Sequence, residues 1–113
     1  MEIELEALLR VRDGRLHDLT GLTAQLWDED IASDDLLSEG VVSGKVPLFR
    51  ALFRFDTKRV SSADSLGEKS PDLYIIVENE QGGQLFRSAV LRNTVLDASA
   101  EPGNPARLEF VEA

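Results

Sequence analysis

The chain has 113 residues, of which 42% are hydrophobic and 29% charged, with a net charge of −9 and no cysteine. This balance excludes a disordered chain, a disulfide-stapled fold and thiolate metal sites. The excess of acids also argues against nucleic acid as a partner, because binding to phosphates requires clustered lysine and arginine.

The first residues, "MEIELEALLR", are acidic, whereas a secretory signal needs a basic start followed by an apolar stretch. No run approaches the ~20 apolar residues that a membrane-spanning helix needs. The sequence therefore predicts synthesis in the cytoplasm, and it leaves open export without a classical signal peptide. Met1 favours a complete protein over one module of a larger chain without deciding between them.

Charge is unevenly distributed along the chain. Residues 1–40 hold eleven acids and three bases, a net −8, whereas residues 41–70 hold six bases and three acids, a net +3. The positive block is predicted to be an outward strand face followed by a loop. It contains Lys45, Arg50, Arg54, Lys58 and Arg59.

Turn signals are dense, and the segments between them alternate between apolar and polar residues, which is typical of half-buried antiparallel strands. In chain order the first alternating segment is 3–11, where a helical stripe of leucines is a competing interpretation. The alternation in the rest of the chain favours a strand there. The next alternating segments are "LTAQLWD", with Leu22, Ala24 and Leu26 on one side, and "LFRALFRF", with four inward residues beginning at Phe49.

Further strands are predicted at 39–43, 72–78, 84–90 and 106–111, with a glycine hairpin at 81–83 and one long polar loop at 56–71. Seven or so short strands without helical periodicity between them predict an all-β fold. We expect a seven- to eight-stranded antiparallel β-sandwich that forms a single domain over residues 1–113.

The segment "DEDIASDDLLSE", residues 28–39, raises the question of a metal site. Clustered carboxylates on a loop are ligands that calcium prefers, and the candidate ligands are Asp28, Asp30, Asp34 and Asp35. The spacing resembles the acidic loop of calcium-dependent membrane-binding β-sandwich domains of the protein-kinase-C type. In that case Ile31 and Leu36 would meet the membrane surface.

That resemblance has departures. The last aspartate lies one residue closer than is usual in that family, and Glu39 and Asp72 are only secondary ligand candidates. A structural loop, in which Asp and Ser side chains accept hydrogen bonds from nearby backbone amides, explains the same residues without a metal. Both interpretations stay open at the level of sequence.

Three stretches, "DLTGLTAQLWDEDIASDDLLSEGVV", "FRFD" and "SPDLYIIVENEQGGQLFRSAVLRNT", together resemble a transthyretin-like (prealbumin-like) β-sandwich domain. The resemblance covers residues 20–94 and implies a Greek-key, prealbumin-like sandwich. Within that family, the three stretches are similar to bacterial versions found in or with secreted or injected toxin-related proteins. The resemblance also implies self-association through strand edges, with a homodimer as one outcome.

Two features of that family are missing here. The Thr-Asp-x-x-Gly-x-Phe turn that usually follows the "EG" strand is replaced by "VVSGKVPLF", and the cysteines of the family's nematode members are absent. Relatives of transthyretin include a hydrolase of a uric-acid breakdown product, but this chain ends "LEFVEA", without that enzyme's C-terminal signature, and His17 is its one histidine. No other set of catalytic residues is recognisable. We therefore expect no enzyme activity and no cofactor other than calcium in the alternative interpretation.

The predicted function is a non-catalytic protein-binding or scaffolding module that acts through strand edges or end loops. The alternative is a calcium-dependent membrane- or ligand-binding domain that uses the acidic loop 28–39. The large aromatic side chains are expected to pack in the core or on strand faces rather than to form a ligand box. They are Trp27, Phe49, Phe53, Phe55, Tyr74 and Phe86.

Overall fold

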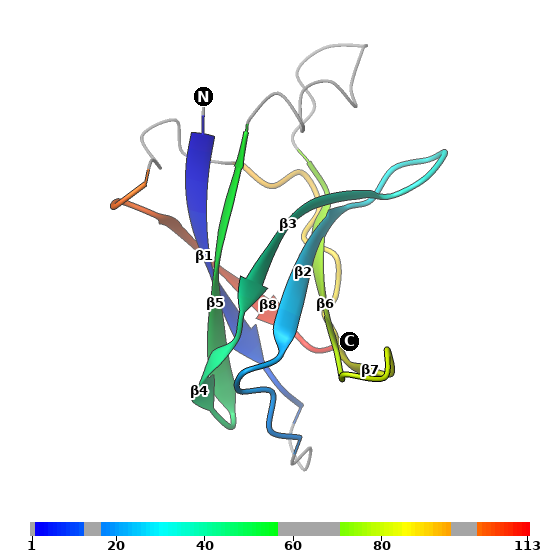
Figure 1. The fold of residues 1–113 in the computed structure, drawn as a ribbon. Helices are drawn as coiled ribbons and strands as arrows, with labels where there is room; N and C mark the ends of the chain where they lie inside the picture. The colour runs from blue at the N-terminus through cyan, green and yellow to red at the C-terminus, as the bar shows by residue number, and fades with distance from the viewer. Residues whose placement is uncertain (1, 13–16, 57–70, 96–101) are drawn as a thin grey trace.

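The computed structural model describes residues 2–12, 17–56, 71–95 and 102–113, and these contain eight strands and no helix. The strands are β1 (Glu2–Arg10), β2 (Thr23–Asp28), β3 (Asp35–Val41), β4 (Ser43–Lys45), β5 (Leu48–Asp56), β6 (Leu73–Glu78), β7 (Gln84–Arg87) and β8 (Ala106–Val111). Their arrangement in two layers is shown in Figure 1. The all-β fold predicted from the alternating pattern is therefore confirmed.

The strands form two four-stranded sheets, which we call sheet A and sheet B. Sheet A has the order β4–β5–β1–β8, and sheet B has the order β3–β2–β6–β7. The first segment, for which a helix was the alternative, is a nine-residue strand paired along its whole length with β5. The long polar loop predicted at 56–71, with Lys58 and Arg59, lies almost entirely outside the described residues.

The core lies between the inner faces of the two sheets. In β1 one parity, from Ile3 through Leu5 to Leu9, is buried, and the inward residues of β5 from Phe49 to Phe55 pack against it. Sheet B contributes Ala24 and Leu26, as predicted. Leu22, expected on the same side, is only partly buried and packs against this core. Because successive side chains of a strand point to opposite faces, the sequence alternation translates directly into this core.

Strand β3 corrects the prediction for the acidic segment. We expected a loop to residue 39 and a short strand at 39–43, but the strand begins at Asp35 and ends at Val41. Leu37 is buried at a register shift between β3 and β2, where one extra residue forms a β-bulge. Because this leucine is buried, the chain joins sheet B at Asp35, four residues before the predicted start of the strand. The loop between β2 and β3 is therefore limited to residues 29–34.

One strand pairing departs from the predicted antiparallel pattern. Strand β8 pairs with β1 in parallel, from Leu5 opposite Ala106 to Arg10 opposite Val111. No hairpin joins these two strands, which lie at opposite ends of the chain, so local sequence does not fix their relative direction. The predicted strand at 84–90 is also shorter in the structure, because β7 ends at Arg87.

The two sheets meet along one side of the sandwich, where β3 crosses β5. The Ser38 hydroxyl donates to the Arg54 carbonyl oxygen at 2.8 Å and accepts from the Arg54 amide at 3.2 Å. Next to it, a Cβ placed on Gly40 would lie 2.4 Å from the Leu52 carbonyl oxygen. The close approach of the two backbones therefore requires glycine at this position.

The opposite side of the sandwich is joined by the residues that follow β7 and β8. The Ala89 amide donates to the Val111 carbonyl oxygen at 2.8 Å, and the Ala113 amide donates to the Arg87 carbonyl oxygen at 2.9 Å. This contact involves the end of β8, whereas the rest of β8 remains at the edge of sheet A.

Candidate functional site

The aspartates of the predicted calcium site lie along the β2–β3 hairpin, whose tip projects from the body of the molecule (Figure 1). Asp28 ends β2 and Asp35 begins β3, directly opposite each other. Asp30 and Asp34 lie in the connecting loop. Asp28 faces the interior with 6% of its surface exposed, whereas Ile31 at the tip is fully exposed.

The loop aspartates accept hydrogen bonds from the protein itself. Asp30 Oδ1 accepts from the Ile31 amide at 2.6 Å, and Asp34 Oδ1 accepts from the Asp30 amide at 3.1 Å. The other oxygen of Asp34, Oδ2, accepts from the Tyr74 hydroxyl. These bonds are what the structural-loop interpretation predicts, since such side chains stabilise turns by binding nearby amides.

Of the secondary ligand candidates, Asp72 lies beside Asp28, whereas Glu39 lies farther along β3. Asp72, which precedes β6, accepts from the Asn93 amide at 2.8 Å and lies 3.4 Å from Arg92 Nη1. Glu39 lies along β3 opposite Gln25, four residues beyond Asp35. Among the described residues, no group of three or more His, Asp or Glu side chains is arranged to hold a metal ion.

Asp28 has the most perturbed environment of the acidic residues in the described ranges. Its pKa is raised to about 6, mainly by burial and in smaller part by the negative charges of Asp35, Asp30 and Asp72. The Asp72 amide opposes this shift by donating to Asp28 Oδ1 at 3.3 Å. This partly desolvated carboxyl at the end of β2 was recognised in the sequence only as a candidate ligand.

An aromatic cluster on the outer face of sheet B fixes the acidic loop. The rings of Trp27 and Tyr74, which are opposite each other on β2 and β6, stack with centroids 6.4 Å apart, and the Arg87 guanidinium lies 4.8 Å from the centre of the Tyr74 ring. Burial and the hydrogen bond to Asp34 together raise the pKa of Tyr74 to about 12, and the same bond lowers the pKa of Asp34. The predicted strand-face packing of these rings is confirmed.

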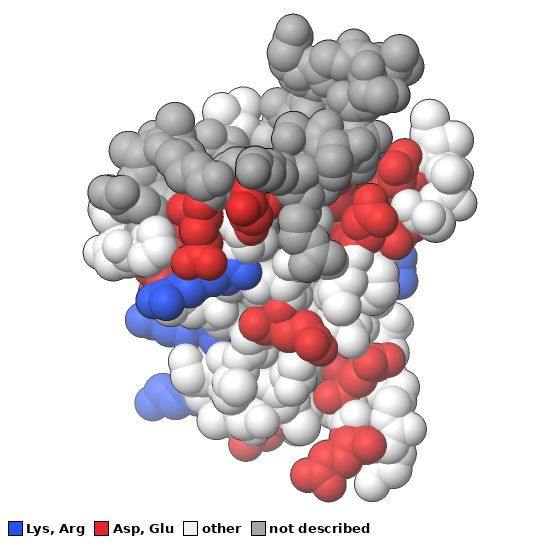
Figure 2. Space-filling model, turned by 45° about the horizontal axis from the view of Figure 1, so that its top comes forward, with Lys and Arg blue, Asp and Glu red and all other residues white. Residues whose placement is uncertain are grey.

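The outer face of sheet A carries cross-strand ion pairs. Arg54 Nε lies 2.7 Å from Glu4 Oε2, which is the main reason that the pKa of Glu4 is lowered. The predicted outward orientation of Arg50 and Arg54 is confirmed, because both alternate with the buried residues of β5. Acidic side chains dominate the face shown in Figure 2, with most of the visible basic groups gathered on one side.

The free edge of β8 is the feature that sequence analysis did not identify. The Glu112 amide donates to the Arg10 carbonyl oxygen at 2.9 Å, toward β1, whereas the Val111 carbonyl oxygen faces the other way and accepts from Ala89. Because backbone groups alternate in direction along a strand, the amides and carbonyls of Arg107 and Glu109 also face away from β1. Within the described part of the chain, these outward groups have no hydrogen-bond partner.

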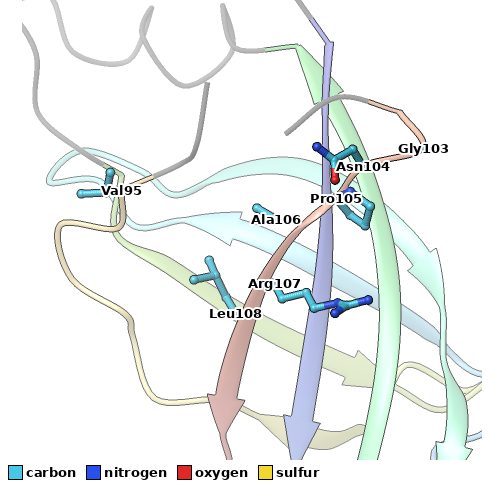
Figure 3. A pocket seen from close by; sticks show the side chains of 7 residues that line it. All are labelled: Val95, Gly103, Asn104, Pro105, Ala106, Arg107 and Leu108. Carbon is cyan, nitrogen blue, oxygen red and sulfur yellow. The ribbon is translucent and has the colours of Figure 1, made fainter. Parts of the chain in front are cut away.

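A shallow hollow of about 570 Å³ lies beside this edge. Its lining consists of Val95 and residues 103–108 (Figure 3). In that view the side chains of Arg107 and Leu108 leave β8 on opposite sides, with Arg107 extending over β1. Val95 is 80% exposed, so an apolar side chain flanks the unpaired backbone.

The side chains of β8 form a charge ladder with β1. Arg107 Nε lies 2.9 Å from Glu6 Oε1, and Arg10 Nη2 lies 2.9 Å from Glu109 Oε1. Pro105 immediately precedes the strand. The alternation in "ARLEFV" predicted this strand correctly, but only the three-dimensional pairing reveals that it lies at an edge.

The structure describes no helix long and apolar enough to cross a membrane. His17, the single histidine, is exposed in the segment that leads to β2.

No protein-family model and no curated protein matches this sequence. Among solved structures, an alternative pilotin from the type II secretion system of Vibrio cholerae is similar over 100% of this chain and 98% of its own. The TM-score is 0.52 and the sequence identity 15%, which indicates a shared fold. A 9R-lipoxygenase from Cyanothece PCC8801 is similar over 94% of this chain, with a TM-score of 0.46 and 13% identity. This chain spans 16% of the lipoxygenase's length, a partial overlap that says nothing about function.

Proposed function

We propose that this chain is a non-catalytic protein-binding module that docks an extended segment of a protein along the free edge of β8. The observation that carries this proposal is the row of outward backbone groups at Arg107 and Glu109, which lack partners within the described residues. An added strand would satisfy these groups, and its side chains would contact the neighbouring hollow.

The other sheet edges are less suited to this role. Strands β4 and β7 span three and four residues. Strand β3 is engaged with β5 through Ser38. The similar fold of a secretion-system pilotin is compatible with a protein-binding role. We also propose that the chain is a member of the bacterial transthyretin-like family and that it is synthesised in the cytoplasm.

Photo-crosslinking tests the docking site. A benzoylphenylalanine introduced at Val95, beside β8, is expected to crosslink a bound protein in cells that produce this chain. The same probe at Val41, an exposed position on β3, serves as the control and is expected to capture much less. Mass spectrometry of the crosslinked peptides identifies the bound segment and its position along β8.

A backbone variant shows whether strand pairing is responsible. Arg107→Pro removes an outward amide without breaking a bond to β1, so the fold is expected to survive. It should lose the crosslink from Val95, whereas Arg107→Ala, which keeps the amide, should retain most of it. Equal crosslinking by folded Arg107→Pro and Arg107→Ala would contradict the proposed mode of binding.

Calcium binding stays a prediction from the sequence. Among the described residues, Asp28, Asp30, Asp34 and Asp35 are not arranged as a metal-binding group, so this alternative rests on the sequence pattern. Calorimetric titration with calcium tests it: heat of binding together with a raised melting temperature would revive the calcium-dependent alternative.

A further inference from the structure

We infer that the segment docking on β8 is β8 of a second copy of this chain, paired antiparallel about a two-fold axis at Leu108. This inference rests on the proposed edge-binding function and specifies its occupant. It follows from three properties of β8: the direction of its backbone groups, the order of its charges and the limits of its free edge.

The direction of the backbone groups restricts the register. Arg107 and Glu109 face outward with both their amide and their carbonyl, whereas Leu108 turns its backbone groups toward β1. In an antiparallel pair, two opposing residues exchange both hydrogen bonds only if the groups of each point toward the other strand. Outward residues must therefore oppose outward residues, which requires the two-fold axis to pass through a residue rather than between two residues.

The charges select one of the remaining registers. With the axis at Leu108, Arg107 lies opposite Glu109 of the second copy, and Glu109 lies opposite its Arg107. An axis at Arg107 would place two arginines opposite each other, and an axis at Glu109 would place two glutamates together. Since like charges directly opposite destabilise a strand pair and unlike charges stabilise it, the register centred on Leu108 is preferred.

The existing ion pairs extend this pattern across both copies. Arg107 already contacts Glu6, and Glu109 already contacts Arg10, on the outer face of sheet A. Pairing at Leu108 would join these ion pairs into two rows of alternating charges that cross both copies, each from Glu6 through Arg107 to Glu109 and Arg10 of the other copy. On the inner face, the half-buried Leu108 side chains of the two copies would meet at the axis beside the hollow.

The ends of the free edge fit this register. Pro105, which has no amide, precedes the strand at one end. At the other end the Val111 carbonyl oxygen is already bonded to the Ala89 amide. The groups left for a partner are those of Arg107 and Glu109, which pair in the proposed dimer, and the Val111 amide, which by the same alternation also faces outward.

Sedimentation analysis of the full chain and of charge-reversal variants tests this inference. The wild-type chain is expected to form a reversible dimer. Arg107→Glu and Glu109→Arg each place like charges opposite each other at both symmetry-related positions. Each is expected to raise the dissociation constant by about tenfold or more, since every affected pair changes from attraction to repulsion.

Mixing the two variants provides the rescue. In a heterodimer of Arg107→Glu with Glu109→Arg, every cross-strand pair is again of opposite charge, so association should return toward the wild-type value. Circular dichroism of each variant verifies that the fold is kept. A merely structural effect of the lost Glu6 or Arg10 ion pair would not be rescued by mixing.

Each remaining outcome contradicts a defined part of the inference. A wild-type chain that stays monomeric overturns the second copy as occupant, and crosslinking of a different protein from Val95 would then leave the proposed function intact. A dimer that is insensitive to both charge reversals, or variants that fail to recover on mixing, overturns the register centred on Leu108.

Discussion

Asp28 combines a role in the loop with a cost to the fold. Its carboxyl accepts a hydrogen bond from the Asp72 amide, yet its side chain faces the interior among other acids. A carboxyl whose pKa is higher in the folded than in the unfolded state binds protons more strongly when folded. Its contribution to stability is therefore largest at low pH and is lost as the pH rises through the folded pKa.

We predict that Asp28→Asn stabilises the protein at pH 7.5 by on the order of 1–2 kcal/mol. This value is less than the full pKa shift implies, because solvent near the β2–β3 loop screens the charge of Asp28. The pKa of Asp28 rises to about 6 in the folded chain, so the penalty of its ionised form accumulates between about pH 4 and pH 6. Asparagine keeps an oxygen that can accept from the Asp72 amide. Urea unfolding of both proteins at pH 4 and pH 7.5 measures the effect.

The variant and the wild type should approach equal stability near pH 4. Comparing the two proteins at each pH cancels the opposite contributions of Glu4 and Asp34, whose pKa values are lowered in the folded state. A difference in unfolding free energy that does not change with pH would contradict the assigned burial of Asp28.

At the scale of elements, the crossing of β3 over β5 holds the two sheets together. Gly40 lets the backbones approach, and Ser38 bonds both the amide and the carbonyl of Arg54. Neither residue stands out in the sequence, which placed Ser38 in the acidic loop and Gly40 in the short strand predicted at 39–43. The contact depends on two strands from different sheets, which no local pattern specifies.

We predict that Gly40→Ala destabilises the fold by about 2–3 kcal/mol, because the new Cβ would overlap the Leu52 carbonyl oxygen and push β3 away from β5. Gly82→Ala is the matched control. It also replaces a glycine, but at a hairpin position with open space, where the cost of the positive φ is about 1–2 kcal/mol. Chemical denaturation compares the two, and an equal cost for both would contradict a steric clash at Gly40.

At the scale of the whole molecule, one core joins the two sheets. Residues of β1, β2, β5, β6, β7 and β8 all belong to the same buried cluster. A shared core makes independent unfolding of either sheet unfavourable, since each would expose the apolar face of the other.

We predict that sheet B and the complete fold unfold in one transition. Trp27 is the single tryptophan and lies on β2 against Tyr74, so its fluorescence reports on sheet B. Far-ultraviolet circular dichroism reports on both sheets. The urea midpoints from the two signals should coincide, and an earlier loss of the Trp27 signal would indicate that sheet B unfolds separately.

The sequence predicted those features of the molecule that depend on alternation. The inward rows of β1, β2 and β5 were recognisable because one face of each strand is apolar. The sequence did not predict the order of strands, the parallel pairing of β8 or its position at an edge, because these depend on contacts between distant segments. The acidic loop was misjudged in length because the burial of Leu37 outweighs the polarity of the residues before it.

The shortness of the free edge has a consequence for the stoichiometry of any assembly formed through it. Two copies joined at Leu108 satisfy each other's outward groups at Arg107 and Glu109, and the closure of β3 on β5 leaves no comparably long strand in those sheets for a third copy. Such a pair is closed by symmetry and cannot grow into a fibre. The same bond between Ser38 and Arg54 that shuts one side of the sandwich would thus also protect the protein from polymerising.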